Sequence, residues 1–235
     1  MVTVVKEKKE AGFEWIDVIN PTKVELSEIA TKYGLPGALV EDCLQPGHLP
    51  KYEMVGDNPF VILRAFNENA PQEADTIQDV TNKIAVFMGS DFIITIHRPA
   101  FDFLDKIKTD SDKNTSPDHI LFRIFAKVIA TYDAPLAALV RDIDACEPKI
   151  FLQKKSSTLL KNLYYIKRRA TVMGHIFELS KSIHENLKGK IASTHFNHLK
   201  DEFLRLQTGT RQIVDNASNL LNIYISLSTD RKSVV

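Results

Sequence analysis

Hydrophobic and polar positions follow two different repeats along the chain, and the change falls near residue 110. Before it, the apolar runs are short, rich in β-branched and aromatic residues, and bounded by Asn, Asp, Gly or Pro, which is typical of strands. These runs are EWIDVI, PFVILRAF, VTNKIAVFM and DFIITIH. The GSD segment at residues 89–91 predicts a tight hairpin between the last two.

Helical segments interrupt these strands. In NPTKVELSEIATKYG, Thr22 and Glu25 predict a capping box at the start of a helix, and Gly34 provides its stop signal. A second short helix is expected after Pro36. Because the segment contains no glycine-rich phosphate loop, no nucleotide site is indicated. We therefore predict an α/β domain over residues 1–110, with an antiparallel or mixed sheet, in a chain of the α+β class.

After the polar segment KTDSDKNTSPD, apolar residues recur at spacings of three and four to the end of the chain. One series runs from Leu121 to Cys146 and a second from Leu160 to Leu187, which predicts a hairpin of two long helices joined by QKKSS. Pro135 lies inside the first series and should kink that helix. Residues 111–235 are therefore predicted to form a long-helix domain.

The third helical series, from Phe196 to Leu227, is the most regular. Its length of roughly 33 residues corresponds to about 50 Å, more than a compact domain of this size requires. Beyond Ile213 the apolar stripe widens, which predicts burial against neighbouring subunits. We expect a coiled-coil-like stalk whose seam consists of Phe203, Leu206, Ile213, Leu220 and Tyr224.

Composition excludes several classes of protein. Lys plus Arg equals Asp plus Glu at 30 each, so the overall charge does not indicate a nucleic-acid-binding protein. Cys43 and Cys146 are isolated, and we interpret both as buried apolar residues in a reducing compartment. The N-terminal residues do not form a signal peptide, and no stretch reaches the roughly 20 apolar residues of a membrane span. The chain as given is expected to be soluble.

Several stretches together resemble the cytoplasmic part of CorA-like divalent-cation channels. They are WIDVINPT (15–22), KYGLPGALVEDCLQPGHLPKYE (32–53), FIITIHRP (92–99), the spacing of Tyr132 and Pro135, and LLNIYISLSTDR (220–231). The resemblance implies a homopentamer in which α/β domains form a funnel and the third long helix of each subunit forms a stalk. It also implies that this helix continues into a first membrane span. We therefore expect an apolar stretch of about 20 residues to begin within roughly ten residues after Val235.

The resemblance also implies a regulatory metal site. Glu41 and Asp42 are adjacent acids, which in most proteins belong to a solvated helix face, but the resemblance implies that they bind Mg²⁺ between subunits. Two positions depart from the family pattern, because His198 replaces a stalk Asp and Thr131 occupies a commonly acidic position. Asp201 follows one turn after His198. With two carboxylates missing, weak Mg²⁺ binding is expected.

Histidines offer an alternative metal site. His195, His198 and Glu202 share one helix face at spacings that permit joint ligation, and imidazole favours Zn²⁺, Co²⁺ or Ni²⁺ over Mg²⁺. We favour the simpler interpretation that the three are exposed polar residues. His97, at the end of a strand, is expected to make a structural hydrogen bond rather than to bind metal.

We predict that the chain is the cytosolic regulatory domain of a CorA-like channel for Mg²⁺, or for Co²⁺, Ni²⁺ or Zn²⁺, and not an enzyme. The full-length protein would lie in the cell membrane with this domain on the cytoplasmic side, where metal bound between subunits keeps the pore closed. The alternative is a soluble coiled-coil scaffold or adaptor with no transport role. A hydrolytic enzyme is not favoured, because no HExxH motif or nucleophile elbow is present.

Overall fold

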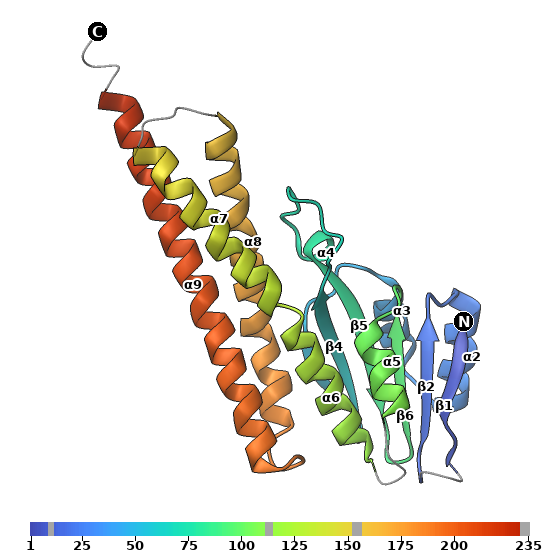
Figure 1. Cartoon of the computed structure of the whole chain (residues 1–235). Helices are drawn as coiled ribbons and strands as arrows, with labels where there is room; N and C mark the ends of the chain where they lie inside the picture. Colours follow the sequence, from blue (N-terminus) through green and yellow to red (C-terminus); the bar gives the residue numbers. More distant parts are fainter. Residues whose placement is uncertain (9–11, 111–114, 152–156, 231–235) are drawn as a thin grey trace.

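A computed structural model of the chain describes residues 1–8, 12–110, 115–151 and 157–230, whose arrangement is shown in Figure 1. A sheet carries helices on both faces, and a group of long helices extends past one end of it. The chain is thus of the α+β class, with a mixed sheet followed by long helices, as predicted.

The sheet has six strands in the order β1-β2-β6-β5-β4-β3. Neighbouring strands are antiparallel except β2 and β6, which are parallel, with Ile16 opposite Ile94. The four expected strands are confirmed, and so is the hairpin between β5 and β6. Two further strands at the sheet edges, β1 and β3, were not predicted. The bounds are β1 Val2–Lys6, β2 Glu14–Ile19, β3 Lys51–Val55, β4 Asn58–Phe66, β5 Thr81–Met88 and β6 Phe92–His97.

Two helices cover one face of the sheet, namely α2 (Lys23–Tyr33) and α3 (Gly37–Leu44). The capping box of α2 is confirmed: the Thr22 amide donates to Glu25 Oε2 at 2.8 Å, and the Glu25 amide donates to Thr22 Oγ1 at 3.2 Å. Gly34 ends the helix at φ 62°, where a residue with a Cβ would be strained. Buried side chains from both helices pack on Phe60 and Ile62 of β4.

The opposite face of the sheet packs against the remaining helices. Alternate residues of β4, such as Val61 and Leu63, point to this side because side chains alternate along a strand. The cluster continues through Ile124 to Leu220, so the sheet and the long helices share one core. The division at residue 110 remains a prediction, and residues 111–114 lie outside the described residues. The elements here are α4 (Ile77–Val80), α5 (Asp102–Thr109), α6 (Pro117–Ala130), α7 (Asp133–Phe151), α8 (Ser157–Asn186) and α9 (Ser193–Asp230).

The prediction of one kinked helix from Leu121 to Cys146 is wrong. The structure has two helices, α6 and α7, separated at Thr131 and Tyr132. Pro135 lies in the first turn of α7, where backbone N–H groups have no acceptor within the helix. The missing N–H of proline therefore costs no helical hydrogen bond at this position. The Tyr132 hydroxyl donates to the Arg64 carbonyl at 2.7 Å and ties the break to β4. The predicted QKKSS turn falls largely on residues 152–156, outside the described residues.

The third long helix is confirmed as α9, which spans 38 residues. It packs against α7 and α8 along its length (Figure 1). Four of the five expected seam residues are 0–6% exposed in the single chain: Phe203, Leu206, Ile213 and Leu220. Tyr224 is half-buried. This part of the seam is therefore core of the chain itself, and these four side chains have little surface left for a neighbouring subunit.

Candidate functional site

Glu41 and Asp42 lie on α3, which the sequence holds in a defined orientation. Pro36 precedes the helix in an extended conformation, and the buried side chains of Leu39 and Cys43 fix the opposite side of the helix to the sheet. Glu41 is exposed and Asp42 is half-buried. The two acids are therefore presented at the surface by a short helix that is anchored from below.

The two carboxylates differ in their surroundings. Asp42 Oδ2 pairs with Lys51 Nζ at 3.1 Å, and its Oδ1 lies 3.3 Å from His48 Nε2. Within the described residues, Glu41 has neither an ion pair nor a side-chain hydrogen bond. Glu41 is thus available to a cation at once, whereas Asp42 must first exchange a basic partner.

Neighbouring carboxylates stabilise the charged form of Lys51. Burial tends to lower the pKa of Lys51, but hydrogen bonds with Glu53 and Asp42 outweigh that effect, and the pKa is raised. The Lys51 ammonium is shared, since it also contacts Glu53 Oε2 at 2.8 Å. Asp42 and Glu53 therefore both pair with Lys51, whereas Glu41 has no ion pair among the described residues. Two acids such as Glu41 and Asp42 could serve only a hydrated hard cation, which binds through one or two protein carboxylates.

The other proposed ligands lie on α9. The side chain of His198 is 76% exposed, with Nε2 3.7 Å from Glu202 Oε1, and Asp201 is also exposed. His195 stacks on Phe122, with ring centroids 6.4 Å apart. Among the residues that the structure describes, no group of three or more His, Cys, Asp or Glu side chains is placed to hold a metal ion.

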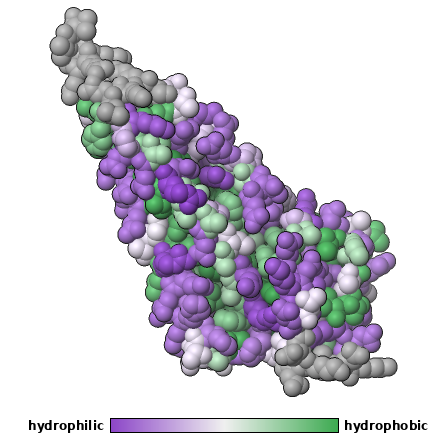
Figure 2. Space-filling model, viewed as in Figure 1, coloured by the Kyte–Doolittle hydropathy of each residue, from purple (hydrophilic) through white to green (hydrophobic). Residues whose placement is uncertain are grey.

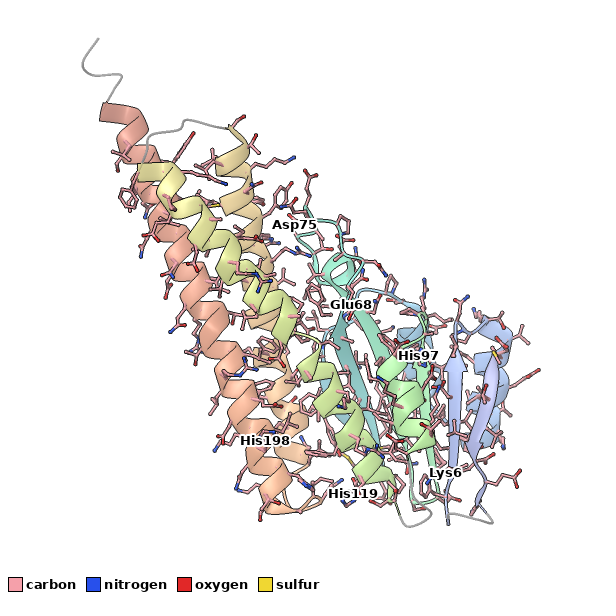
Figure 3. The ribbon with its side chains drawn as sticks, viewed as in Figure 1. Lys6, Glu68, Asp75, His97, His119 and His198 are labelled. Atoms are coloured by element: carbon pink, nitrogen blue, oxygen red, sulfur yellow. The ribbon has the colours of Figure 1, made fainter. Side chains whose placement is uncertain are left out.

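Within one chain, the acidic pair and His198 do not meet. Helix α3 covers one face of the sheet, whereas α9 lies beyond the helices on the opposite face (Figure 1), and Figure 3 labels His198 on the outer side of α9. A shared ion would require Glu41 and Asp42 of one chain to approach His198 or Asp201 of another. Whether these residues bind metal remains a prediction.

Thr131 has a structural role in the chain. Its hydroxyl accepts a hydrogen bond from the Phe66 amide at 2.9 Å and donates one to the Val128 carbonyl at 2.6 Å. It thereby joins the end of α6 to β4. A carboxylate at this position would lack the hydroxyl proton that Thr131 donates to the Val128 carbonyl.

The expectation for His97 is confirmed, because its ring is buried in a hydrogen-bond network. Its Nε2 lies 3.0 Å from Asp17 Oδ1, and its Nδ1 lies 2.6 Å from the Pro99 carbonyl. Asp17 also accepts from Thr95 Oγ1 at 2.5 Å and pairs with Lys108 Nζ at 2.6 Å. This network links β2, β6 and α5 inside the fold. Cys43 and Cys146 are free and buried, also as expected.

The C-terminal part of α9 presents hydrophobic side chains. Ile225 is 56% exposed, and Leu221, Ile223 and Leu227 are only partly buried. Figure 2 shows a mostly hydrophilic surface, with hydrophobic side chains near this end of the helix. The widening of the apolar stripe therefore corresponds to partly uncovered surface. Within the described part of the chain, no helix has the length and apolar character needed to cross a membrane.

Comparison with known proteins finds similarity along almost the whole chain. The family described as "CorA-like Mg2+ transporter protein" matches residues 10–235. The curated "Putative metal ion transporter YfjQ" of Bacillus subtilis (strain 168) is 20% identical over 241 residues, which cover 97% of this chain and 73% of that protein.

Solved structures share the fold at low sequence identity. The complete CorA magnesium transporter from Methanocaldococcus jannaschii gives a TM-score of 0.76 at 16% identity, covering 94% of this chain and 72% of that one. The soluble domain of CorA from the same organism gives a TM-score of 0.65 at 16% identity, and the match covers 95% of this chain and 89% of that domain. The ZntB cytoplasmic domain from Vibrio parahaemolyticus RIMD 2210633 gives a TM-score of 0.68 at 14% identity, and the match covers 93% of this chain and 88% of that domain.

Proposed function

Because this chain belongs to the CorA-like Mg²⁺ transporter family, we propose that it is the cytoplasmic regulatory domain of a divalent metal-ion channel. The family is one of transporters and not of enzymes. The observation that carries the proposal is the extent of the family match, which runs from residue 10 to residue 235 and includes every strand except β1, together with α3 and α9. Transport itself is assigned to the complete protein in the cell membrane, with this domain on its cytoplasmic side.

The regulatory ligand that we propose is Mg²⁺, bound by Glu41 and Asp42. Mg²⁺ retains most of its water and commonly uses one or two carboxylates, which is what this pair offers. The ion pair of Asp42 with Lys51 at 3.1 Å competes with the metal, so binding is weak. Co²⁺, Ni²⁺ and Zn²⁺ are the alternative ions, and each would gain from an imidazole ligand such as His198.

The assembly that we propose is a homopentamer with α9 as the stalk. Two observations support it: the 38-residue length of α9 and the exposure of Ile225 near the end of that helix. In this arrangement Asp201 or His198 of one subunit approaches the acidic pair of its neighbour. Metal at that boundary holds the subunits together and the pore closed, and its loss lets them separate.

The transport proposal is tested with the product of the complete gene in liposomes that contain a Mg²⁺-sensitive dye. The proposal expects Mg²⁺ to enter down its gradient, with Co²⁺, Ni²⁺ and Zn²⁺ compared in parallel. Protein-containing liposomes that admit none of the four ions would contradict a channel and favour a scaffold.

The identity of the regulatory ion is tested by calorimetric titration of the assembled protein with Mg²⁺ and Zn²⁺, at pH 7.5 and pH 5.5. We expect weak Mg²⁺ binding that Asp42→Asn reduces and His198→Ala leaves unchanged. Tight Zn²⁺ binding that is lost at pH 5.5 and in His198→Ala would assign the site to imidazole instead, because protonated imidazole does not bind metal.

A further inference from the structure

Three basic side chains converge below the C-terminal end of α3, and the proposed function makes no use of them. Arg64 comes from β4, Lys83 from β5, and Arg98 directly follows β6. Each donates to backbone carbonyls in residues 42–46. Arg64 donates to Pro46 at 2.8 Å, Arg98 donates to Leu44 at 2.7 Å, and Lys83 donates to Asp42 and Gln45.

In the part of the chain that the structure describes, none of these three basic side chains forms an ion pair with Asp or Glu. Asp42, on the adjacent helix, directs its carboxylate to Lys51 at 3.1 Å and to His48 at 3.3 Å instead. The carbonyl groups supply only partial negative charge. Buried charges are normally paired, so an uncompensated cluster of this kind indicates a missing anion.

The three side chains lie at different depths. Arg64 is only 2% exposed, and its Nε is buried without a hydrogen-bond partner. Lys83 is half-buried, and Arg98 is exposed. The cluster therefore leads from the surface to a deeply buried guanidinium that has an unused donor.

A cavity of about 80 Å³ lies among these side chains. Gln78, Thr81 and Asn82 add neutral polar groups to its lining. A single water needs about 10–15 Å³ of such volume, so the space accommodates several waters or one small ion. Because arginine has five N–H donors and lysine three, the contacts with carbonyls leave donors for a ligand.

We propose that this cavity binds a small oxyanion of the phosphate class, with Arg64 at its base, Lys83 at its side and Arg98 at its entrance. Guanidinium groups recognise tetrahedral oxyanions through paired N–H donors, and lysine adds a point charge. The ligand would satisfy the unpartnered Nε of Arg64 and balance the excess positive charge.

The test is calorimetric titration of the 235-residue chain with inorganic phosphate at an ionic strength held constant with chloride. We expect Lys83→Met and Arg98→Gln each to weaken binding by about tenfold, because a hydrogen bond to a charged group is worth that much or more. Arg98 is exposed, so this variant should keep its fold, which circular dichroism checks. Arg141→Gln, an exposed site on α7, is the control with the same charge change and should bind like the unmodified chain.

One further titration sharpens the result. Glycerol 3-phosphate distinguishes a phosphate monoester from free phosphate as the natural source, and binding of either supports the site. Phosphate that binds no better than chloride, or equal phosphate affinity in Arg98→Gln and the unmodified chain, would overturn the proposal.

Discussion

In the metal site that we propose on α3, the ion pair between Asp42 and Lys51 limits how readily the acidic pair accepts a cation. Asp42 lies between Lys51 and His48, whereas Glu41 has no side-chain partner among the described residues. Mg²⁺ affinity rises with the number of charged oxygens that converge on the ion. Lys51 reduces that number by occupying one oxygen of Asp42. A cation must break the ion pair between Asp42 and Lys51 before it can use both oxygens of Asp42. Its binding is therefore weaker by the free energy of that ion pair.

Replacing Lys51 with Met should strengthen Mg²⁺ binding by roughly two- to fivefold, because a partly exposed ion pair is worth up to about 1 kcal/mol. Calorimetric titration of the assembled protein measures the change. Lys188→Met removes the same charge from an exposed position after α8 and serves as the control. An equal gain in both variants would mean that only the net charge matters and not the contact with Asp42.

Asp17 makes folding stability depend on pH. Burial would raise the pKa of this carboxyl, but hydrogen bonds from His97, Lys108 and Thr95, together with the charge of His97, outweigh burial and lower it. A carboxyl whose pKa is lower in the folded chain stabilises the fold above its unfolded pKa of about 3.9. That stabilisation is lost as the pH falls through the folded pKa. The contribution is therefore complete at neutral pH and disappears in acid.

Asp17→Asn should lower the free energy of unfolding at pH 7 by about 3 to 5 kcal/mol, because it leaves buried basic groups without their partner. It should also flatten the pH dependence of stability below about pH 5. Urea unfolding across this range measures both effects. Asp105→Asn is the control, since exposed Asp105 contacts the same Lys108 at 2.8 Å, and its effect should stay within about 0.5 kcal/mol. Similar losses in the two variants would contradict the role given to the buried carboxylate.

Helix α9 has two apolar surfaces with different roles. The regular series that includes Leu206 and Ile213 is buried against the chain's own α7 and α8. A second surface, toward the C-terminal end of the helix, includes the exposed Ile225. Folding of the chain therefore depends on the first surface, and in the assembly that we propose the second surface contacts other subunits.

Leu206 and Leu204 provide a matched test of this division. Leu206 is 0% exposed and Leu204 is 47% exposed on the same helix. Leu206→Ala should cost about 2 to 5 kcal/mol of stability, since it removes buried methyl groups and leaves a cavity. Leu204→Ala should cost less than about 1 kcal/mol. Denaturant unfolding of the two variants decides the point, and comparable losses would mean that α9 does not pack as described.

Local signals predicted most elements but not the break between α6 and α7. The capping box at Thr22 and the stop at Gly34 act through neighbouring residues, so the sequence displays them directly. Pro135 signalled a disturbance of this series, but the sequence did not show that the helix ends at Thr131 and Tyr132, where the Tyr132 hydroxyl donates to the carbonyl of Arg64, a residue far away in the chain. The edge strands β1 and β3 are less buried than the central strands, so their apolar pattern is weaker.

The candidate site was predictable in its residues but not in its contacts. The resemblance pointed to Glu41 and Asp42, and the structure places both on one surface helix. The pairing of Asp42 with Lys51 depends on how α3 lies against β3, which spacing alone does not reveal. Arg64 did carry a signal, because a lone arginine inside the apolar run PFVILRAF is costly unless a partner meets it.

At the scale of the whole molecule, α3 and α9 lie on opposite sides of the sheet, and each packs into a different hydrophobic cluster (Figure 1). One chain therefore presents an acidic surface on one side and a long helix with His198 and Asp201 on the other. We propose that a ring of such chains brings the two surfaces together at each boundary. A regulatory ion bound at that boundary would then respond to the separation of subunits.

The most direct test of this account is Mg²⁺ flux through the product of the complete gene in liposomes, measured with and without Mg²⁺ on the side of this domain. The account predicts that Mg²⁺ on that side slows the flux of the unmodified protein. It predicts little slowing in a Glu41→Gln and Asp42→Asn double variant. Equal inhibition of both proteins, or no inhibition of either, would contradict the claim that the acidic pair on α3 controls the pore.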